Sequence, residues 1–389
     1  MSKNLSLETR CVHLGEVNDA FGSPHTPIYN TTTFGFKSTA DILDVVEGRK
    51  SGPLYSRYGL NPSILSIEEK LAGLEGAEAA LVFSSGMAAE AALFMALGRK
   101  GVICLGDAYG GTLELISQQL PQIGIKTHML LGKTLDRLEG LLKEGAGIVF
   151  FETPTNPNLE IFHIRTISDL AHKYGAIVAV DNTFASPVNQ QPLRLGADVV
   201  IHSATKYLGG HSDITAGAMM GRKELLQSVW PWRKNLGQTP SPEVAALLSR
   251  SLKTLSVRVR QQNESAMFIA KKLSVHPKIA KVLYPGLEGF PQLELARAQM
   301  SGFGGMITIE TKGKFEDAAA FCDHLNLFTI APSLGGTESL VTMPVTTTHH
   351  GLGREERLER GITDTTVRIS NGLESKEDLL NDLLQSLDR

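Results

Sequence analysis

The sequence predicts an α/β protein in which helices cover both faces of a mostly parallel central sheet and a smaller C-terminal α+β domain follows. Three observations support this prediction. Short, wholly apolar runs alternate with helical stretches through the middle of the chain, a pattern typical of buried parallel strands joined by helices. The chain has 389 residues, which is long enough for two or three subdomains. After about residue 245 the alternation loosens, which indicates a second domain.

Residues 1–60 show no sustained hydrophobic period and carry turn-forming residues such as Gly22, Pro24 and Pro53. We therefore expect an extended N-terminal arm without a core of its own. Another surface must cover such an arm.

Residues 61–245 form the predicted α/β domain. Apolar positions 64, 67, 71 and 74 have helical spacing, and the helix should end near Gly76. The other expected elements are strands 79–83, 102–105, 148–151, 177–180 and 199–201 and helices 88–97 and 164–174.

Residues 246–389 form the predicted C-terminal α+β domain, with strands at 306–309 and 366–369 and a helix at 315–325. A last helix follows Ser375, because Ser375 and Asp378 resemble a capping box. Five leucines then form one stripe: Leu379, Leu380, Leu383, Leu384 and Leu387.

Composition excludes several classes of protein. The 38 Lys and Arg against 41 Asp and Glu leave no basic excess to hold a nucleic acid. No apolar run has the length of a membrane span or a signal peptide, so we expect a cytosolic protein without a membrane partner. Cys11, Cys104 and Cys322 lack paired spacing, so neither a disulfide framework nor a cysteine zinc site is expected, and buried free thiols are the simplest interpretation.

Polar residues follow several of the predicted strands. Strand 79–83 leads through two serines into Gly86 and Met87 at a helix start, where free amide groups can bind an anion. A tight turn with Ser as the N-cap is the alternative. Asp181 follows the predicted strand 177–180, at the edge where parallel sheets usually bind ligands. Tyr109 follows strand 102–105 and is flanked by glycines, although it can equally be a packed tyrosine.

Ser203 and Lys206 allow two interpretations. One is a serine hydrolase in which lysine activates serine, but its companion motifs Ser-Asp-Asn and Lys-Thr-Gly are absent. The other is a lysine that binds an aldehyde cofactor as an imine, with neighbouring hydroxyls on the cofactor phosphate. Pyridoxal phosphate needs such a lysine, a carboxylate for its ring nitrogen, a phosphate cup and an aromatic face. The second interpretation uses all the residues described above.

Seven motifs in chain order resemble the Cys/Met-metabolism family of pyridoxal-phosphate enzymes, which includes cystathionine γ-synthases and the cystathionine and methionine γ-lyases. The motifs are Tyr55-Ser-Arg57, Ser84-Ser-Gly-Met87, Asp107-Ala-Tyr-Gly-Gly111, Glu152-Thr-Pro-Thr-Asn-Pro157, Val180-Asp-Asn-Thr183, His202-Ser-Ala-Thr-Lys-Tyr207 and Val367-Arg-Ile-Ser370. The resemblance implies a fold of the aspartate aminotransferase type. It also implies the cofactor pyridoxal 5'-phosphate.

The resemblance implies a role for each matching residue. Lys206 matches the lysine that binds the cofactor and moves protons, Asp181 the partner of the ring nitrogen, and Tyr109 the stacked aromatic ring. The phosphate cup is expected at Gly86, Met87, Ser203 and Thr205, an arm reaching a neighbouring subunit's phosphate at Tyr55 and Arg57, and substrate carboxylate contacts at Asn156, Ser333 and Arg368. The resemblance thus implies a homodimer as the minimal active unit and a homotetramer as the assembly.

The expected reaction is γ-elimination or γ-replacement at a sulfur amino acid or an O-acylhomoserine. A lyase would release 2-oxobutanoate, ammonia and a thiol. A transferase of the cystathionine γ-synthase or O-acylhomoserine sulfhydrylase type shares the catalytic residues and stays an alternative. No metal is expected, since His349 and His350 lack a third ligand of suitable spacing.

Four positions depart from the family pattern. Leu54 and Pro332 stand where cystathionine-handling members usually carry acidic residues, and Gly111 stands where methionine γ-lyases typically carry cysteine. Asn371 stands where an apolar residue is common. We therefore expect the outer half of the pocket to be less polar, which favours a simple thioether or an acyl-homoserine over cystathionine.

Overall fold

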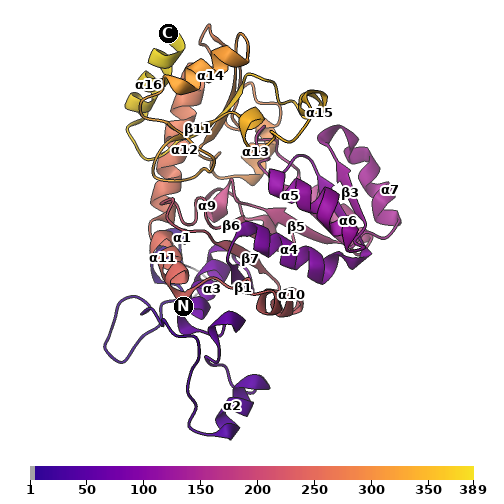
Figure 1. The fold of residues 1–389 in the computed structure, drawn as a ribbon, viewed down its shortest axis with the longest axis vertical. Coiled ribbons are helices and arrows are strands. Elements are labelled where there is room, and N and C mark those ends of the chain that lie inside the picture. The colour runs from indigo at the N-terminus through magenta and orange to yellow at the C-terminus, as the bar shows by residue number, and fades with distance from the viewer. Residues whose placement is uncertain (1–4) are drawn as a thin grey trace.

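The computed structural model describes residues 5–389 and, for residues 133–135, the backbone alone. Figure 1 shows a large domain, a smaller C-terminal domain beside it, and an N-terminal segment that extends away from both. The large domain is built on a seven-stranded sheet. In sheet order, its strands are β1 (Ala79–Phe83), β7 (Gly217–Gly221), β6 (Val199–Ser203), β5 (Ile177–Asp181), β4 (Ile148–Glu152), β2 (Val102–Leu105) and β3 (Thr127–Leu130).

Strand direction brings several polar strand ends to one edge of this sheet. Strands β6, β5, β4, β2 and β3 are mutually parallel, and β7 is antiparallel to both of its neighbours, β1 and β6. β1 therefore runs in the same direction as β6. The carboxyl ends of β1, β2, β4, β5 and β6 consequently meet at one edge, the usual ligand side of such sheets.

Helices cover both faces of the large sheet. They are α3 (Pro62–Glu75), α4 (Gly86–Leu97), α5 (Gly110–Glu114), α6 (Leu120–Gln122), α7 (Leu138–Lys143), α8 (Ile164–Lys173), α9 (Ser186–Asn189), α10 (Lys223–Asn235) and α11 (Pro242–Leu252). Side chains alternate between the faces along each strand. In β1, Leu81 and Phe83 pack with α4 and α10, whereas Ala80 and Val82 pack with α3 and α11. Both faces are therefore buried, which explains why the strands are wholly apolar.

The C-terminal domain is a five-stranded sheet with its own core. In sheet order, its strands are β10 (Thr329–Ile330), β11 (Leu340–Thr342), β12 (Thr366–Ser370), β9 (Met306–Thr311) and β8 (Ile279–Leu283). Its helices are α13 (Leu293–Gln299), α14 (Phe315–Asp323), α15 (Arg354–Glu359) and α16 (Lys376–Asp388). The Ser375 hydroxyl caps α16 by accepting from the Asp378 N–H, and the leucine stripe of α16 packs in this core, as predicted.

Helix α12 (Leu255–Leu273) joins the two domains. Leu255 and Val259 pack in the core of the large domain, and Ile269 and Leu273 pack in the C-terminal core. Arg258 of the same helix donates hydrogen bonds to the carbonyl oxygens of Tyr207, at 2.8 Å, and of Ser251 and Leu208, at 3.0 and 3.5 Å. The turn that carries Lys206 is thus fixed to the helix that joins the domains.

The predicted fold class is confirmed, and the elements expected from the sequence are present with small shifts of their ends. β7 was not predicted, because its sequence Gly-Ala-Met-Met-Gly does not look like a strand. Glycine is needed at its start, since a Cβ on Gly217 would lie 2.0 Å from the Ser85 carbonyl oxygen. α12 was not predicted either, because buried polar side chains, among them Arg258 and Gln262, obscure its apolar face.

The N-terminal segment contains two helices that sequence analysis did not predict. α1 (Leu7–His13) packs on α3 and α12, and α2 (Thr39–Val46) has no buried residue. Figure 1 shows α2 at the far tip of the segment, away from both domains. The domain limits at residues 60 and 245 stay predictions.

The three cysteines, Cys11, Cys104 and Cys322, are buried and free, as expected. None of the described helices is both long and apolar enough to cross a membrane. The cytosolic location stays a prediction.

Candidate active site

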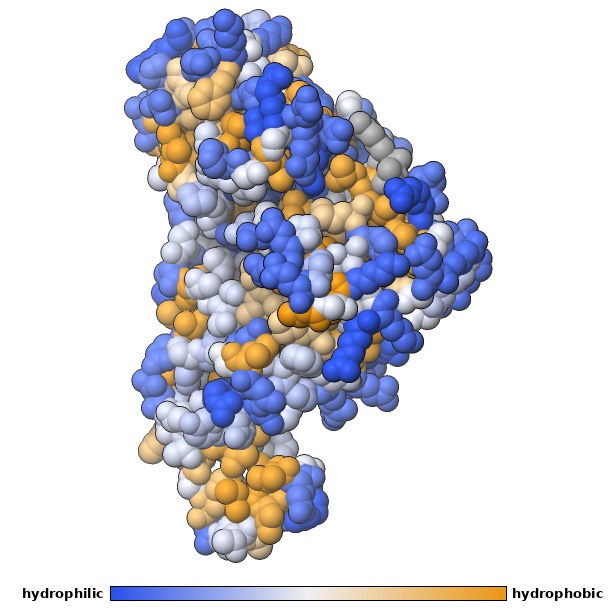
Figure 2. Space-filling model, turned by 45° about the vertical axis from the view of Figure 1, so that its right-hand side comes forward, coloured by the Kyte–Doolittle hydropathy of each residue, from blue (hydrophilic) through white to orange (hydrophobic). Residues whose placement is uncertain are grey.

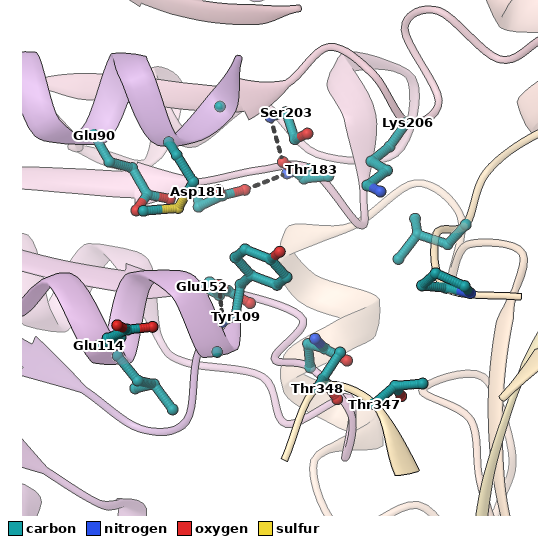
Figure 3. A pocket seen from close by; sticks show the side chains of 18 of the residues that line it. Glu90, Tyr109, Glu114, Glu152, Asp181, Thr183, Ser203, Lys206, Thr347 and Thr348 are labelled. Atoms are coloured by element: carbon teal, nitrogen blue, oxygen red, sulfur yellow. Dashed lines mark hydrogen bonds between the residues drawn. The ribbon is translucent and has the colours of Figure 1, made fainter. Parts of the chain in front are cut away.

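A cavity of about 920 Å³ lies between the carboxyl edge of the large sheet and the C-terminal domain. Figure 3 shows side chains from both domains pointing into it. Ten of the residues expected from the sequence line it: Gly86, Met87, Tyr109, Asn156, Asp181, Ser203, Thr205, Lys206, Ser333 and Arg368. Parallel strand ends and the start of α4 are thus combined with two segments of the C-terminal domain.

The start of α4 provides a cradle for an anion. The Ser85 hydroxyl caps the helix by accepting from the Ala88 N–H, and Gly86 and Met87, whose N–H groups have no partner inside the helix, line the cavity. A Cβ on Gly86 would lie 3.0 Å from both Cα and Cβ of Ser203, so glycine permits the close approach of β6. The Ser203 hydroxyl has no partner among the described residues, whereas the Thr205 hydroxyl donates to the Ala216 carbonyl at 3.2 Å. This cradle suits a phosphate group.

Asp181 lies at the end of β5 and is 7% exposed. Its Oδ1 accepts from the Thr183 N–H at 2.8 Å, and the Thr183 hydroxyl accepts from the Ser203 N–H at 2.8 Å, as the dashed lines in Figure 3 show. Burial raises the pKa of Asp181, while hydrogen bonds from Thr183 and the nearby His202 oppose that rise. A positively charged ring nitrogen beside Asp181 would offset the unfavourable burial of this carboxylate.

Lys206 follows β6, and its Nζ donates to the Ser333 hydroxyl at 2.8 Å. Burial, together with the charge of Arg368, lowers the pKa of Lys206 to about 8. A useful fraction of the amine is therefore neutral near pH 7, as nucleophilic attack on an aldehyde requires. Because the amine pairs with Ser333 and not with Ser203, the geometry does not support the serine hydrolase interpretation.

Arg368 on β12 provides a buried cation in the part of the cavity wall that the C-terminal domain contributes. Its Nη1 donates to Asn156 Oδ1 and its Nη2 donates to the Ser333 carbonyl oxygen, both at 3.0 Å. Burial lowers the pKa of Arg368 to about 10, so the side chain remains charged at neutral pH. A planar guanidinium held in this way suits a substrate carboxylate. Ser333 itself has φ of 104°, a strained conformation of the kind found at ligand sites.

Tyr109 is 49% exposed and stands at the start of α5. Its N–H donates to Glu152 Oε1 at 2.6 Å. A Cβ on Gly111 would lie 2.8 Å from Cε1 of the tyrosine ring, so the glycine leaves room for this ring orientation. Figure 3 shows the ring of Tyr109 projecting into the cavity between Asp181 and Thr348.

Tyr55 and Arg57 do not line the cavity of their own chain. Arg57 Nη1 donates to the Lys234 carbonyl oxygen at 2.8 Å, and its guanidinium lies 5.0 Å from the centre of the Tyr58 ring. Both residues lie in the segment between the α2 tip and α3. Their expected contact with a neighbouring subunit stays a prediction.

The expected low polarity of the outer cavity stays a prediction. Glu114, Glu356 and Arg360 are charged residues of the cavity lining, and Pro332 and Gly111 line the cavity too. The sequence did not point to Glu356 or Arg360, because they reach the cavity on and just after α15, far from the motifs along the chain. Of the remaining unusual positions, Leu54 does not line the cavity, and the Asn371 side chain donates to the Gly305 carbonyl oxygen at 2.8 Å.

The sequence also did not reveal the contacts that hold Arg360 in the cavity wall. Asp107 accepts from Arg360 at 2.6 Å and is 3.2 Å from His349 Nε2. His349 is fully buried. No cluster of metal-ligating side chains occurs within the described residues. The salt bridge between Asp107 and Arg360 joins residues 253 positions apart, so no local sequence pattern could reveal it.

Comparison with known proteins identifies the family. Residues 8–388 match the model of the Cys/Met metabolism PLP-dependent enzyme family. The chain belongs to this family. The resemblance stated from the motifs is thereby confirmed, and the protein is a pyridoxal-phosphate-dependent enzyme of sulfur amino acid metabolism.

Relatives match the chain along its length. Cystathionine gamma-synthase 1, chloroplastic, of Arabidopsis thaliana is 42% identical and aligns with 97% of this chain and 68% of its own. The L-methionine gamma-lyase of Fusobacterium nucleatum subsp. nucleatum is 38% identical over 100% of this chain and 99% of its own. The crystal structure of metB from Corynebacterium glutamicum has a TM-score of 0.93 at 38% identity, covering 100% and 99% of the two chains.

The pH dependence of cofactor capture tests the environment of Lys206. With a pKa of about 8, the neutral fraction of the amine should rise about tenfold per pH unit up to that value and then level off. Replacing Arg368 by Met removes the cation that helps to lower this pKa, so the curve should move to higher pH. Stopped-flow absorbance of apoprotein mixed with pyridoxal phosphate measures both curves.

A surface arginine provides the control for this measurement. Arg297→Met removes a cation on α13, far from the cavity lining, and should leave the curve in place. A wild-type midpoint near that of free lysine, about 10.4, would contradict the lowered pKa of Lys206.

Proposed function

We propose that this enzyme catalyses γ-elimination or γ-replacement at an amino acid that carries a thioether or an acyl ester on Cγ. The observation that carries the proposal is the double contact of Ser333. Its hydroxyl accepts from Lys206 and its carbonyl oxygen accepts from Arg368. A base for the Cα and Cβ protons is therefore held at a fixed position relative to a cation for the α-carboxylate. The names of the relatives, cystathionine gamma-synthase and L-methionine gamma-lyase, support the same chemistry.

The residues of the cavity fit the cofactor. The start of α4 and the Ser203 hydroxyl would hold its phosphate, Asp181 its ring nitrogen, Tyr109 a face of its ring, and Lys206 its aldehyde. When bound, pyridoxal phosphate supplies an electron sink that lets the Cα–H bond break. The rest of the mechanism concerns side chains of this chain.

Arg368 orients the substrate. Its guanidinium binds the α-carboxylate, with the Asn156 side chain and the Ser333 carbonyl oxygen keeping the guanidinium plane fixed. This contact would determine which bond at Cα is perpendicular to the plane of the cofactor ring. A charged bidentate contact of this kind contributes on the order of 2–4 kcal/mol.

Lys206 and Tyr109 move the protons. Lys206 Nζ, in its neutral form, would accept the Cα proton, would give that proton up to the bound cofactor, and would only then accept a Cβ proton. The Tyr109 hydroxyl donates a proton to the group that leaves Cγ. With a thioether substrate, one molecule of water is consumed, and 2-oxobutanoate, ammonia and a thiol are formed. When a thiol adds at Cγ and no water is consumed, the amino group is retained and the product is a new thioether.

A product assay tests this proposal. Methionine, cystathionine, cysteine and O-acetylhomoserine are offered with and without a thiol, and the products are separated by chromatography. We expect 2-oxobutanoate from a γ-substituted substrate, a new thioether when thiol is present, or both. Tyr109→Phe should lower the rate about a hundredfold or more. Tyr174→Phe, on the distant α8 side of the sheet, is the matched control and should retain the rate.

Other products would contradict the proposal. Pyruvate as the only oxo acid, from cystathionine or cysteine, would place the reaction at Cβ. Turnover of none of these amino acids by protein that retains pyridoxal phosphate would exclude both forms of γ-chemistry.

We further propose that the active unit is a homodimer at least, and a homotetramer in its full assembly. Ile42, Leu43 and Val46 of α2 are 37%, 50% and 61% exposed, and Figure 2 shows apolar surface gathered on the projecting tip. A second copy of the chain would cover this surface. In that arrangement the segment with Tyr55 and Arg57 reaches the phosphate cradle of the neighbouring subunit.

Complementation tests the shared site. Arg57→Ala disables the partner's site, and Lys206→Ala disables the site of its own chain. Coexpression of the two variants should recover activity above the sum of the separate variants, because mixed dimers contain one site with both residues intact. If Arg57 acts within its own chain, no mixed site is complete and coexpression recovers nothing.

A further inference from the structure

Glu90 is a buried carboxylic acid that the proposed mechanism does not use. It lies one turn into α4, is 3% exposed and lines the cavity. Its Oε2 accepts from the Thr112 hydroxyl at 2.7 Å. Figure 3 shows its carboxyl group beside that of Asp181. Sequence analysis did not select Glu90, because a single glutamate on a helix usually faces solvent.

Within the described residues no cation pairs with Glu90. The ionisable groups that interact with it are the carboxyls of Asp181 and Glu152 and the thiol of Cys104. The other titratable groups on elements packed against α4 are Arg99, Lys100, Glu114, His202, Lys223, Glu224, Arg233 and Lys234. Of these, His202 pairs with Glu75 and Arg233 pairs with Glu68. Burial and the charge of Asp181 together raise the pKa of Glu90 to about 8.

The two neighbouring carboxyls have unequal support for a negative charge. Asp181 accepts from Thr183 and lies near His202, and both interactions favour its ionised form. Among the described residues, the Thr112 hydroxyl alone donates a hydrogen bond to Glu90. Two buried carboxylates this close do not both ionise easily, so the charge resides on Asp181 and the proton on Glu90.

We propose that Glu90 holds the single proton of the Glu90–Asp181 pair, and that Glu90 is thereby a positioning residue that keeps the negative charge on Asp181, where the ring nitrogen of the cofactor would bind. Cofactor binding then releases this proton from a fraction of the protein molecules. The negative charge of Asp181 helps to keep Glu90 protonated. A cationic ring nitrogen beside Asp181 would offset that charge, so Glu90 would lose its proton more easily. The inference rests on the proposed role of Asp181.

The direction of the pH dependence follows from this release. When binding releases a proton, affinity rises with pH, by at most tenfold per pH unit for one proton. For Glu90 the rise ends near pH 8, above which the free protein has already lost the proton. Deprotonation of Lys206 acts in the same direction. Only a comparison with a variant that lacks the Glu90 proton separates the two contributions.

Calorimetric titration of apoprotein with pyridoxal phosphate makes that comparison. Measurements in buffers of different ionisation enthalpy, between pH 6 and 8, give the number of protons released per cofactor bound. Glu90→Gln keeps the shape of the protonated acid and should release fewer protons, with a shallower rise of affinity with pH. Glu114→Gln, which removes an exposed carboxylate from the opening of the same cavity, should release as many protons as wild type.

A cofactor analogue with C–H in place of the ring nitrogen shows whether the effect passes through that atom. With this analogue, wild type and Glu90→Gln should release equal numbers of protons. Thr112→Val provides a second variant in case the Gln protein does not fold. Loss of the Thr112 hydroxyl should raise the pKa of Glu90 further and move the proton release to higher pH.

Equal proton release from wild type and Glu90→Gln with pyridoxal phosphate would overturn the inference. So would a difference of the same size with the analogue. Failure of the proposed function is distinct, because it shows in the products of turnover, whereas this experiment measures proton release on cofactor binding alone.

Discussion

The contact between Lys206, Ser333 and Arg368 is the constraint on which the site depends. Lys206 belongs to the large domain, whereas Ser333 and Arg368 belong to the C-terminal domain. The position of the base relative to the carboxylate-binding cation is therefore set by how the two domains pack. Arg258 on α12 reinforces that packing, because it binds the carbonyl oxygens beside Lys206 while its helix enters both cores.

Charge distribution in the cavity follows from the same arrangement. Cations lie on the side of Lys206 and Arg368, where an amino acid's carboxylate would bind, and carboxyls lie on the side of Asp181, Glu90 and Glu152. Burial makes each group sensitive to its neighbours: it lowers the pKa of the lysine and raises the pKa values of the acids. An electron-accepting ring placed between these two sides would have the carboxyls beside its nitrogen and the Lys206 amine beside its aldehyde.

Much of this was predictable from the sequence, and the limits have physical causes. Apolar strands such as 79–83 are recognisable because both of their faces are buried, and polar residues that follow parallel strands must meet at one edge. The sequence could not reveal β7, because its glycines are required by the close approach of neighbouring backbone. It could not reveal the role of Glu90 either, because Thr112 and Asp181 in other elements create its environment. The position of Arg360 in the cavity wall depends on its salt bridge with Asp107, and a pair so far apart along the chain leaves no local sequence pattern.

The most direct test of the account is chemical trapping at Lys206. The holoprotein is reduced with borohydride, digested, and its peptides are analysed by mass spectrometry. We expect the peptide containing Lys206 to gain the mass of one reduced phosphopyridoxyl group and no other lysine to gain it. An unmodified Lys206, or the same added mass on a different lysine, would contradict it.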